Sequence, residues 1–178
     1  ATANNQAPAQ DDGQEIGAST MPERVGKTIQ IFLPTGEPRG LRVAELTTRI
    51  VQAVLIPRSD LVLAKQRPEL DHVAVYYLFG ESESQAKPRV YVGQTEDVRT
   101  RLDYHNSRKD FWQTVVLGIS STASFNQAHV RWLEWYSIQR VREVGRFALD
   151  NDNTPSKPFV TEPMEADLFD SFETLATL

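Results

Sequence analysis

The chain has 178 residues, no cysteine, 40% hydrophobic residues and a formal net charge of −5 at pH 7. This length suits one domain with additions, the composition allows a hydrophobic core, and the missing cysteines exclude disulfides and thiolate metal sites. No stretch approaches the roughly 18 uninterrupted apolar residues of a membrane span, and the first residues lack the basic start and apolar run of a secretory signal, so we expect a cytoplasmic protein with no membrane partner.

The N-terminal part of the chain predicts a leader followed by a small β-rich subdomain. Residues 1–25 are rich in Ala, Gln, Asn, Asp and Gly without periodicity, which is typical of a disordered leader. Extended runs follow at 28–33, 41–46 and 49–57. A short helix is expected at 59–66, and Pro68 is expected to prevent it from continuing. We assign residues 26–70 to this subdomain.

The next part predicts a hairpin and a helix. The dense apolar run at 72–80 and the run RVYVG at 89–93 are typical of two strands, joined by a polar loop. Gly93 is expected to end the second strand. Thr95 is a plausible N-cap for a helix that runs to about Ser107.

A third strand and a long helix complete this unit, which we place at residues 71–158. The run FWQTVVLGIS, at 111–120, predicts the strand. Ser124 and Gln127 fit a capping box that opens a helix from about 125 to 144, and Gly145 is its natural terminator. The pattern predicts an α+β fold with a small mixed three-stranded sheet flanked by helices.

The two ends of the chain are acidic. Residues 1–26 carry −3 and residues 159–178 carry −5; subtracting both from the total of −5 leaves +3 for residues 27–158. The net charge argues mildly against a nucleic-acid partner, whereas the basic middle is compatible with a phosphate-binding surface. Segment 159–178 alternates acids with Leu and Phe. It is either an interaction helix for a protein partner or, as we prefer, a helix near 164–174 packed on its own domain.

Several polar side chains occupy positions that packing alone does not explain. Tyr76 and Tyr91 lie in neighbouring predicted strands, inside apolar runs, where each hydroxyl needs a partner. Arg101 and His105 are four residues apart on one helical face, and they offer a fork for phosphate oxygens and a ring that titrates near neutrality. Glu134 falls within the apolar stripe of the long helix, so its carboxylate needs a cation, either an arginine or a metal.

Each feature also has a structural explanation when it is taken alone. The tyrosines can be satisfied core residues and the Arg–His pair a solvated helix edge. Glu134 can form an ion pair with Arg101 or Arg131. Together, however, these groups match the needs of phosphodiester hydrolysis: a proton acceptor for water, a cation on the developing charge and a metal for the leaving oxygen.

The order of these residues resembles the GIY-YIG nuclease family, which is named for two short strand motifs. The first motif is similar to Ala74-Val75-Tyr76, with alanine in place of glycine, and the second to Tyr91-Val92-Gly93. The residues that stand where the family has its arginine, its frequent histidine and its metal-binding glutamate are Arg101, His105 and Glu134. The resemblance covers about residues 72–156.

Further positions carry supporting parts of the resemblance. The late asparagine of the family falls at Asn151 or Asn153, of which we prefer Asn151, and His129 is a further supporting candidate. Residues 26–70 lie outside the nuclease core. They look similar to an N-terminal β extension on a group of bacterial members.

The resemblance implies a metal-dependent endonuclease that hydrolyses phosphodiester bonds in DNA. Glu134 would be the only protein ligand of one Mg²⁺, or Mn²⁺ in its place. Tyr76 would be the general base, held by Tyr91 and His105, and Arg101 would bind the scissile phosphate. The alternatives are a non-catalytic nucleic-acid-binding module of the same fold and a protein-interaction domain.

Overall fold

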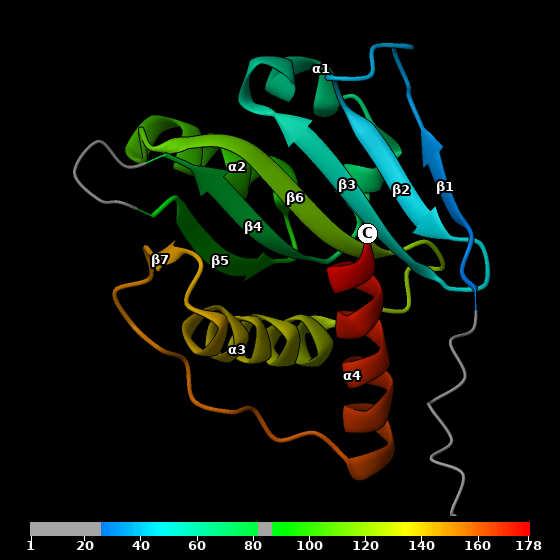
Figure 1. Cartoon of the computed structure of the whole chain (residues 1–178), viewed down its shortest axis with the longest axis vertical. Helices are drawn as coiled ribbons and strands as arrows, with labels where there is room; N and C mark the ends of the chain where they lie inside the picture. Colours follow the sequence, from blue (N-terminus) through cyan, green and yellow to red (C-terminus); the bar gives the residue numbers. More distant parts are fainter. Residues whose placement is uncertain (1–25, 82–86) are drawn as a thin grey trace, which may run out of the picture.

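Strands from both halves of the chain join in one mixed sheet. The computed structural model of the protein describes residues 26–81 and 87–178. Seven strands pair in the order β1-β2-β3-β6-β4-β5-β7, with helices on both faces (Figure 1). The leader expected at 1–25 and most of the loop that joins the expected hairpin strands lie outside the described residues.

The elements occur close to where the sequence predicts them. The strands are β1 (Ile29–Phe32), β2 (Arg42–Leu46), β3 (Val51–Pro57), β4 (Ala74–Gly80), β5 (Arg89–Thr95), β6 (Trp112–Ser120) and β7 (Ala148–Leu149). The helices are α1 (Leu61–Ala64), α2 (Val98–Arg108), α3 (Gln127–Val144) and α4 (Glu162–Thr177), with short 3-10 helices at Arg58–Asp60 and Pro68–Asp71. None of the described helices combines the length and the apolar character needed to cross a bilayer.

The α+β class is confirmed, but the expected three-stranded sheet is wrong. β3 runs antiparallel to β6 from the pair Val51 and Ser120 to the pair Pro57 and Thr114. This pairing adds β1, β2 and β3 to the sheet that β4, β5 and β6 form. The short strand β7, which the sequence analysis does not predict, pairs in parallel with β5 at Arg89 and Val90.

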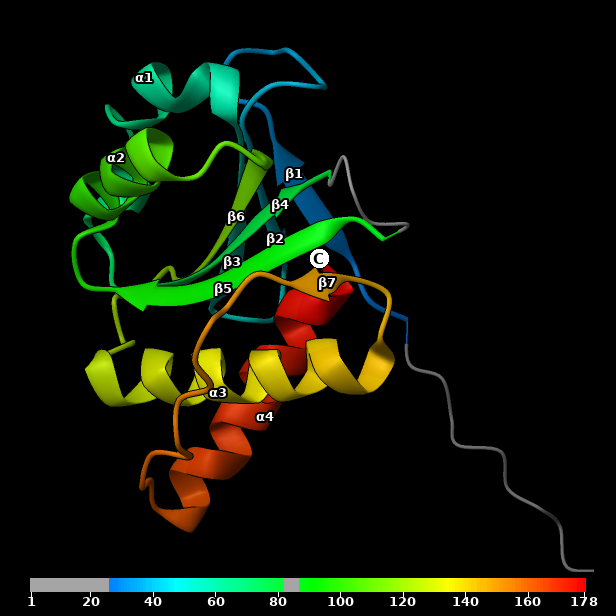
Figure 2. The same cartoon turned by 90° about the vertical axis from the view of Figure 1, so that its left-hand side faces the viewer.

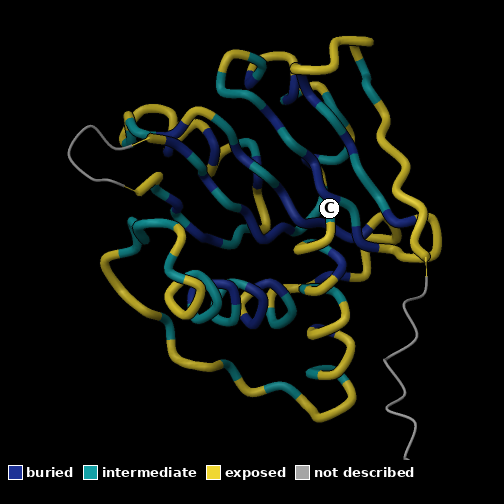
Figure 3. Tube along the Cα trace, viewed as in Figure 1, coloured by how far each residue is buried: buried dark blue, intermediate teal, exposed yellow. Residues whose placement is uncertain are grey.

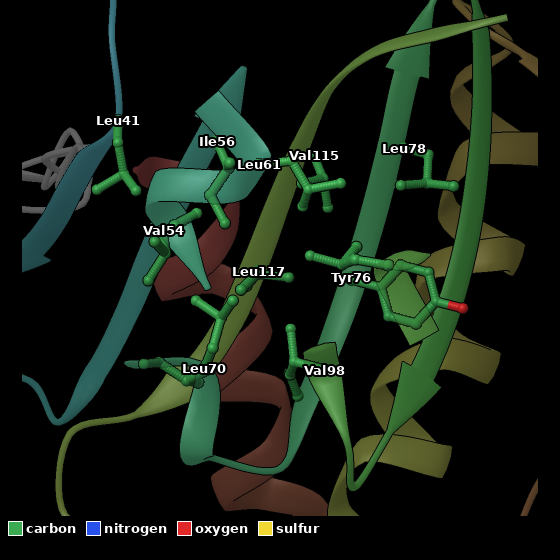
Figure 4. Close-up of a cluster of buried hydrophobic side chains, with 14 of the residues drawn as sticks. Leu41, Val54, Ile56, Leu61, Leu70, Tyr76, Leu78, Val98, Val115 and Leu117 are labelled. Carbon is green, nitrogen blue, oxygen red and sulfur yellow. The ribbon is translucent and has the colours of Figure 1, made fainter. Parts of the chain in front are cut away.

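Side chains of β4 alternate between the two faces of the sheet, as the period of two requires. Tyr76 and Leu78 belong to a buried cluster on the side of α1 and α2 (Figure 4). Tyr77 and Phe79 pack in a second cluster on the side of α3 and α4. Figure 2 shows the sheet between these two pairs of helices. Buried residues are concentrated in the central strands and along α3 (Figure 3), where the sheet is covered by helices.

The start of α2 corrects two expectations. β5 does not end at Gly93 but continues to Thr95, so Thr95 is not the N-cap. Asp97 caps α2 instead, and its side chain accepts a hydrogen bond from the backbone N–H of Thr100. The hydroxyl of Thr95 accepts the N–H of Asp97, which closes the turn between strand and helix.

The capping box of α3 is also formed by residues other than the expected pair. Asn126 is the N-cap and His129 completes the box; Ser124 and Gln127 do not. The Ser124 hydroxyl is instead bonded to the Ser120 hydroxyl at 2.8 Å. Gly145 ends α3 as expected, in the left-handed conformation at a φ of 66°.

The acidic C-terminal segment packs on its own domain, which confirms the preferred interpretation. Leu168 of α4 is only 1% exposed. Phe169 meets Trp132 of α3 edge to face, with 4.8 Å between the ring centroids. Arg49, at the turn before β3, forms an ion pair with Asp170.

Truncating the buried leucine of α4 should measure this packing. Leu168→Ala is expected to lower the free energy of unfolding by about 2 kcal/mol. This is the low end for a leucine truncation, because α4 can shift into the space that the shorter side chain leaves. Phe159→Ala is the control, because Phe159 is 91% exposed and should change stability little. Chemical denaturation of the three proteins measures the difference. Equal stabilities would contradict the packing of α4.

Candidate active site

Tyr76 crosses from β4 to β5 in the space left by Gly93. The two residues are paired in the antiparallel register. A Cβ atom on Gly93 would lie within 3.0 Å of three atoms of Tyr76, the hydroxyl oxygen among them. Figure 4 shows the ring reaching toward β5. Tyr91, on the same face, stacks with it at 6.2 Å between centroids. The register therefore brings the tyrosines of the two motifs together.

His105 of α2 closes this cluster. Its Nε2 atom lies 2.7 Å from the Tyr76 hydroxyl oxygen, and its ring centroid lies 5.0 Å from that of Tyr91. Burial, with the positive charges of Arg101 and Lys109, lowers the pKa of His105 to about 4. The imidazole is therefore neutral at physiological pH. The tautomer decides the direction of its bond to Tyr76: with the proton on Nδ1, Nε2 accepts the hydrogen of the hydroxyl, and in the other tautomer Nε2 donates. Nδ1 is buried and has no hydrogen-bond partner among the described residues.

Lys109 and Asp150 border the cluster, and the sequence analysis does not identify either. The Lys109 ammonium lies 4.5 Å from the centroid of the Tyr91 ring and 2.5 Å from a carboxylate oxygen of Asp150. Lys109 follows the last residue of α2, and Asp150 follows β7. Nothing in the sequence around them distinguishes them from other surface charges.

Among the supporting candidates, Asn151 and His129 form hydrogen bonds with backbone groups. Asn151 binds Val92 of β5 twice: its Oδ1 accepts the Val92 N–H at 3.0 Å and its Nδ2 donates to the Val92 carbonyl at 2.7 Å. This amide continues the pairing of β7 with β5. Asn153 is exposed, and the Nδ1 atom of His129 accepts the N–H of Asn126 at 3.0 Å in the cap of α3.

The valines of the two motifs do not face the tyrosine cluster. Val75 and Val92 are buried in the cluster on the side of α3 and α4. They fix β4 and β5 against α3, which carries Glu134. The motif residues thus divide between the two faces of the sheet, with the tyrosines toward α2 and the valines toward α3.

Arg101 links the tyrosine cluster to Glu134 electrostatically. Its positive charge lowers the pKa of Tyr76, of His105 and of Glu134. Glu134 also acts on Tyr76, whose pKa its negative charge raises. Arg101 is exposed on α2, whereas Glu134 is half-buried on α3. The charge of one guanidinium therefore acts on all three groups.

The carboxylate of Glu134 is free of a direct ion pair. Burial raises its pKa, and the nearby positive charges of Arg101 and Arg131 oppose that rise. Within residues 26–81 and 87–178, no cation lies within 4 Å of it. The ion pair with Arg101 or Arg131 that a structural role would predict is thus not formed. A carboxylate in this setting suits a bound cation.

A metal at this place would have a sparse protein shell. The described part of the chain contains no group of three or more His, Cys, Asp or Glu side chains that could hold a metal ion. A single carboxylate excludes a structural zinc site, which needs about four protein ligands. It fits Mg²⁺, which keeps several waters and often takes one or two carboxylates together with substrate phosphates.

Tyr76 is a neutral phenol in this environment. Burial is the largest influence on its pKa and raises it above its ordinary value, Tyr91 raises it further, and Arg101 lowers it. No lasting phenolate forms at neutral pH. Any proton that Tyr76 takes must be matched by one that it gives away.

Comparison of the chain with family models, curated proteins and solved structures finds no match. The resemblance to the GIY-YIG family therefore stays a prediction from its motifs.

The low pKa of His105 predicts that the fold loses stability in mild acid. The folded state holds the imidazole neutral down to about pH 4, whereas the unfolded chain protonates it near pH 6.5. Stability from this group is therefore present above pH 6.5 and is lost as the pH falls to 4. The pKa difference corresponds to about 3 kcal/mol, which solvent screening reduces to roughly 2 kcal/mol. Denaturation of the wild type and of His105→Gln across this range measures it. The same pH dependence in both proteins would contradict the assignment.

Proposed function

We propose that the protein is a metal-dependent endonuclease that hydrolyses phosphodiester bonds in DNA. One observation carries the proposal: the Tyr76 hydroxyl lies 2.7 Å from Nε2 of His105 and the Tyr76 ring stacks with that of Tyr91. The charge of Arg101 influences the pKa of Tyr76, of His105 and of Glu134. We infer that a phosphate bound by the Arg101 guanidinium is within reach of both the phenol of Tyr76 and the carboxylate of Glu134. These are the proton acceptor and the metal ligand that the hydrolysis needs.

Tyr76 is the proposed general base for the attacking water. As it takes a proton from water, it gives its own hydroxyl proton to Nε2 of His105, 2.7 Å away. No lasting phenolate is needed, which agrees with the raised pKa of Tyr76. A bound phosphate would offset the charges of Arg101 and Lys109 that lower the pKa of His105. Substrate thus makes His105 a better proton acceptor.

Arg101 and Glu134 have the remaining roles. Arg101 binds the scissile phosphate and stabilises the charge that develops on it. Glu134 would hold Mg²⁺ or Mn²⁺, with water and phosphate oxygens completing the shell. When bound, such an ion supplies positive charge for the leaving oxygen.

A cleavage assay tests the proposal. Purified protein with Mg²⁺ or Mn²⁺ is expected to cut at least one of linear, nicked and branched DNA, and chelation should stop the reaction. Tyr76→Phe keeps the ring over Gly93 but removes the hydroxyl, so cleavage should fall by about a hundredfold or more. Tyr104→Phe is the matched control, because Tyr104 is 52% exposed on the same helix as His105. Wild-type cleavage by Tyr76→Phe would contradict the role of the phenol.

A non-catalytic nucleic-acid-binding module is the second candidate. It is favoured by the burial of Tyr76, which is 1% exposed and hydrogen-bonded to His105. Such a pair also describes a satisfied core tyrosine. Binding of DNA without any product, in either metal, would support this module over the enzyme.

A further inference from the structure

A cavity lies on the face of the sheet opposite to Tyr76. Its volume is about 550 Å³, within the range of small-molecule sites. The strands provide its floor, and α3 and α4, which lie on one side of the sheet (Figure 2), provide its walls. Apolar side chains form most of the lining, among them Leu55, Phe79, Val116, Val141, Phe172 and Leu175.

The charged side chains in this lining are all arginines. Arg42, Arg140 and Arg146 line the cavity, no aspartate or glutamate of the described residues joins them, and the neutral polar residues are Tyr77 and Ser137. Arg140 is paired with Glu143. Among the residues that the structure describes, neither Arg42 nor Arg146 has an acidic partner within 4 Å. An apolar space with unneutralised guanidinium groups complements an anion with an apolar tail.

Arg42 is the arginine of the lining with a buried, unpaired atom. Arg140 and Arg146 lie near the C-terminus of α3, where the helix dipole favours cations. Arg42 lies in β2, and the C-terminal end of α4 lines the same cavity. The Nε atom of Arg42 is buried and has no hydrogen-bond partner within the described ranges. A buried charged donor without an acceptor is costly. A ligand oxygen would remove that cost.

We propose that this cavity binds an anionic amphiphile, with its carboxylate or phosphate head at Arg42 and Arg146 and its tail on the apolar floor. Tyr77, which is half-buried, and Ser137, which is buried, also line the cavity, and their hydroxyl oxygens are hydrogen-bonded at 2.8 Å. Because these two groups satisfy each other, the part of the ligand that lies over them needs no polar atom. The polar contacts are thus confined to the arginines.

The site is separate from the tyrosine cluster. Tyr77 and Phe79 face the cavity, whereas Tyr76 and Leu78 face α2. The inference does not rest on nuclease activity, and its test uses neither metal nor nucleic acid.

Isothermal titration calorimetry of the full chain tests the proposal with octanoate, octyl phosphate and octanol. Octanoate or octyl phosphate is expected to bind at one site and at least about tenfold more tightly than octanol, because a charged hydrogen bond is worth about that factor. Comparing octanoate with octyl phosphate identifies the preferred head group. Octanol binding as tightly as both anions would overturn the proposal, and so would the absence of binding by all three.

Two variants locate the ligand. Arg42→Gln should weaken binding of the anions about tenfold, whereas Arg39→Gln, in an exposed turn outside the cavity, should leave it unchanged. Val144→Glu places a carboxylate at a half-exposed position of the lining (53% exposed) and should weaken the anions without unfolding the protein. Unchanged affinity in both Arg42→Gln and Val144→Glu would overturn the proposal. A wild-type dimer that Val144→Glu dissociates would also overturn it, by assigning this face to a subunit contact.

Discussion

Replacing Glu134 with glutamine is expected to reduce metal-dependent cleavage about a thousandfold and, at the same time, to leave the protein as stable or slightly more stable. A metal ion supplies several kcal/mol of charge stabilisation in such reactions, which corresponds to about that factor. Glutamine has the shape of glutamate but not its charge. Burial raises the pKa of Glu134, so its charged form is less favourable in the folded state than in the unfolded chain. A neutral side chain at this position therefore removes a cost to folding.

Opposite changes in activity and stability separate a functional carboxylate from a structural one. Glu143→Gln is the control on the same helix, because Glu143 is exposed and pairs only with Arg140 among the ion pairs of the described residues. It should change neither property much. DNA cleavage in Mg²⁺ and thermal unfolding are measured on the same preparations. Normal cleavage by Glu134→Gln would disprove the metal role, and a large loss of stability would assign Glu134 to a structural ion pair.

The sequence predicts the strands well because their signal is local. The apolar runs of β4 and β6 are visible within a few residues, and each predicted strand begins and ends near its expected position. The pairing of β3 with β6 is not local: Val51 lies opposite Ser120. No short pattern carries that register, so the sequence predicts only the three-stranded sheet of β4, β5 and β6. β7 has two residues, too few for any alternation.

The sequence mispredicts the N-caps of α2 and α3, because several polar residues compete for the N-cap position at each helix. Both Thr95 and Asp97 are acceptable N-caps by residue type, as are both Ser124 and Asn126. In each case the unused residue has another hydrogen-bond partner. The Thr95 hydroxyl accepts the N–H of Asp97 in the turn after β5, and the Ser124 hydroxyl is bonded to that of Ser120.

The candidate site shows the same limit. Tyr76, Tyr91 and His105 meet because the strand register and one helix bring them together, and their motif spacing indicated that. Lys109 and Asp150 join them only because the end of α2 meets the loop after β7. The half-burial of Glu134 followed from its place in an apolar stripe. Its relation to Arg101 depends on two helices on opposite faces of the sheet.

Replacing Gly93 with alanine is expected to destabilise the protein by more than about 3 kcal/mol, at the upper end for overpacking. Residue preference alone predicts the opposite sign, because alanine in a strand is favoured over glycine by roughly 0.5–1 kcal/mol. The new methyl group would lie within 3.0 Å of three atoms of Tyr76. That ring is 1% exposed and bonded to His105, so it has little room to move. Cleavage should fall as well, because the phenol is displaced.

A double-mutant cycle attributes the loss to this contact. In a Tyr76→Ala background, Gly93→Ala should cost less than about 1 kcal/mol, because the ring that it meets is gone. Gly26→Ala is the control for the substitution itself, since among the described residues no heavy atom beyond its chain neighbours lies within 4 Å of a Cβ at that position. Denaturant unfolding of the four proteins of the cycle gives the coupling. If Gly93→Ala costs the same with and without the tyrosine, the ring does not occupy the space beside Gly93. The strand register that joins the two motifs would then be wrong, because it is this register that sets Tyr76 opposite Gly93.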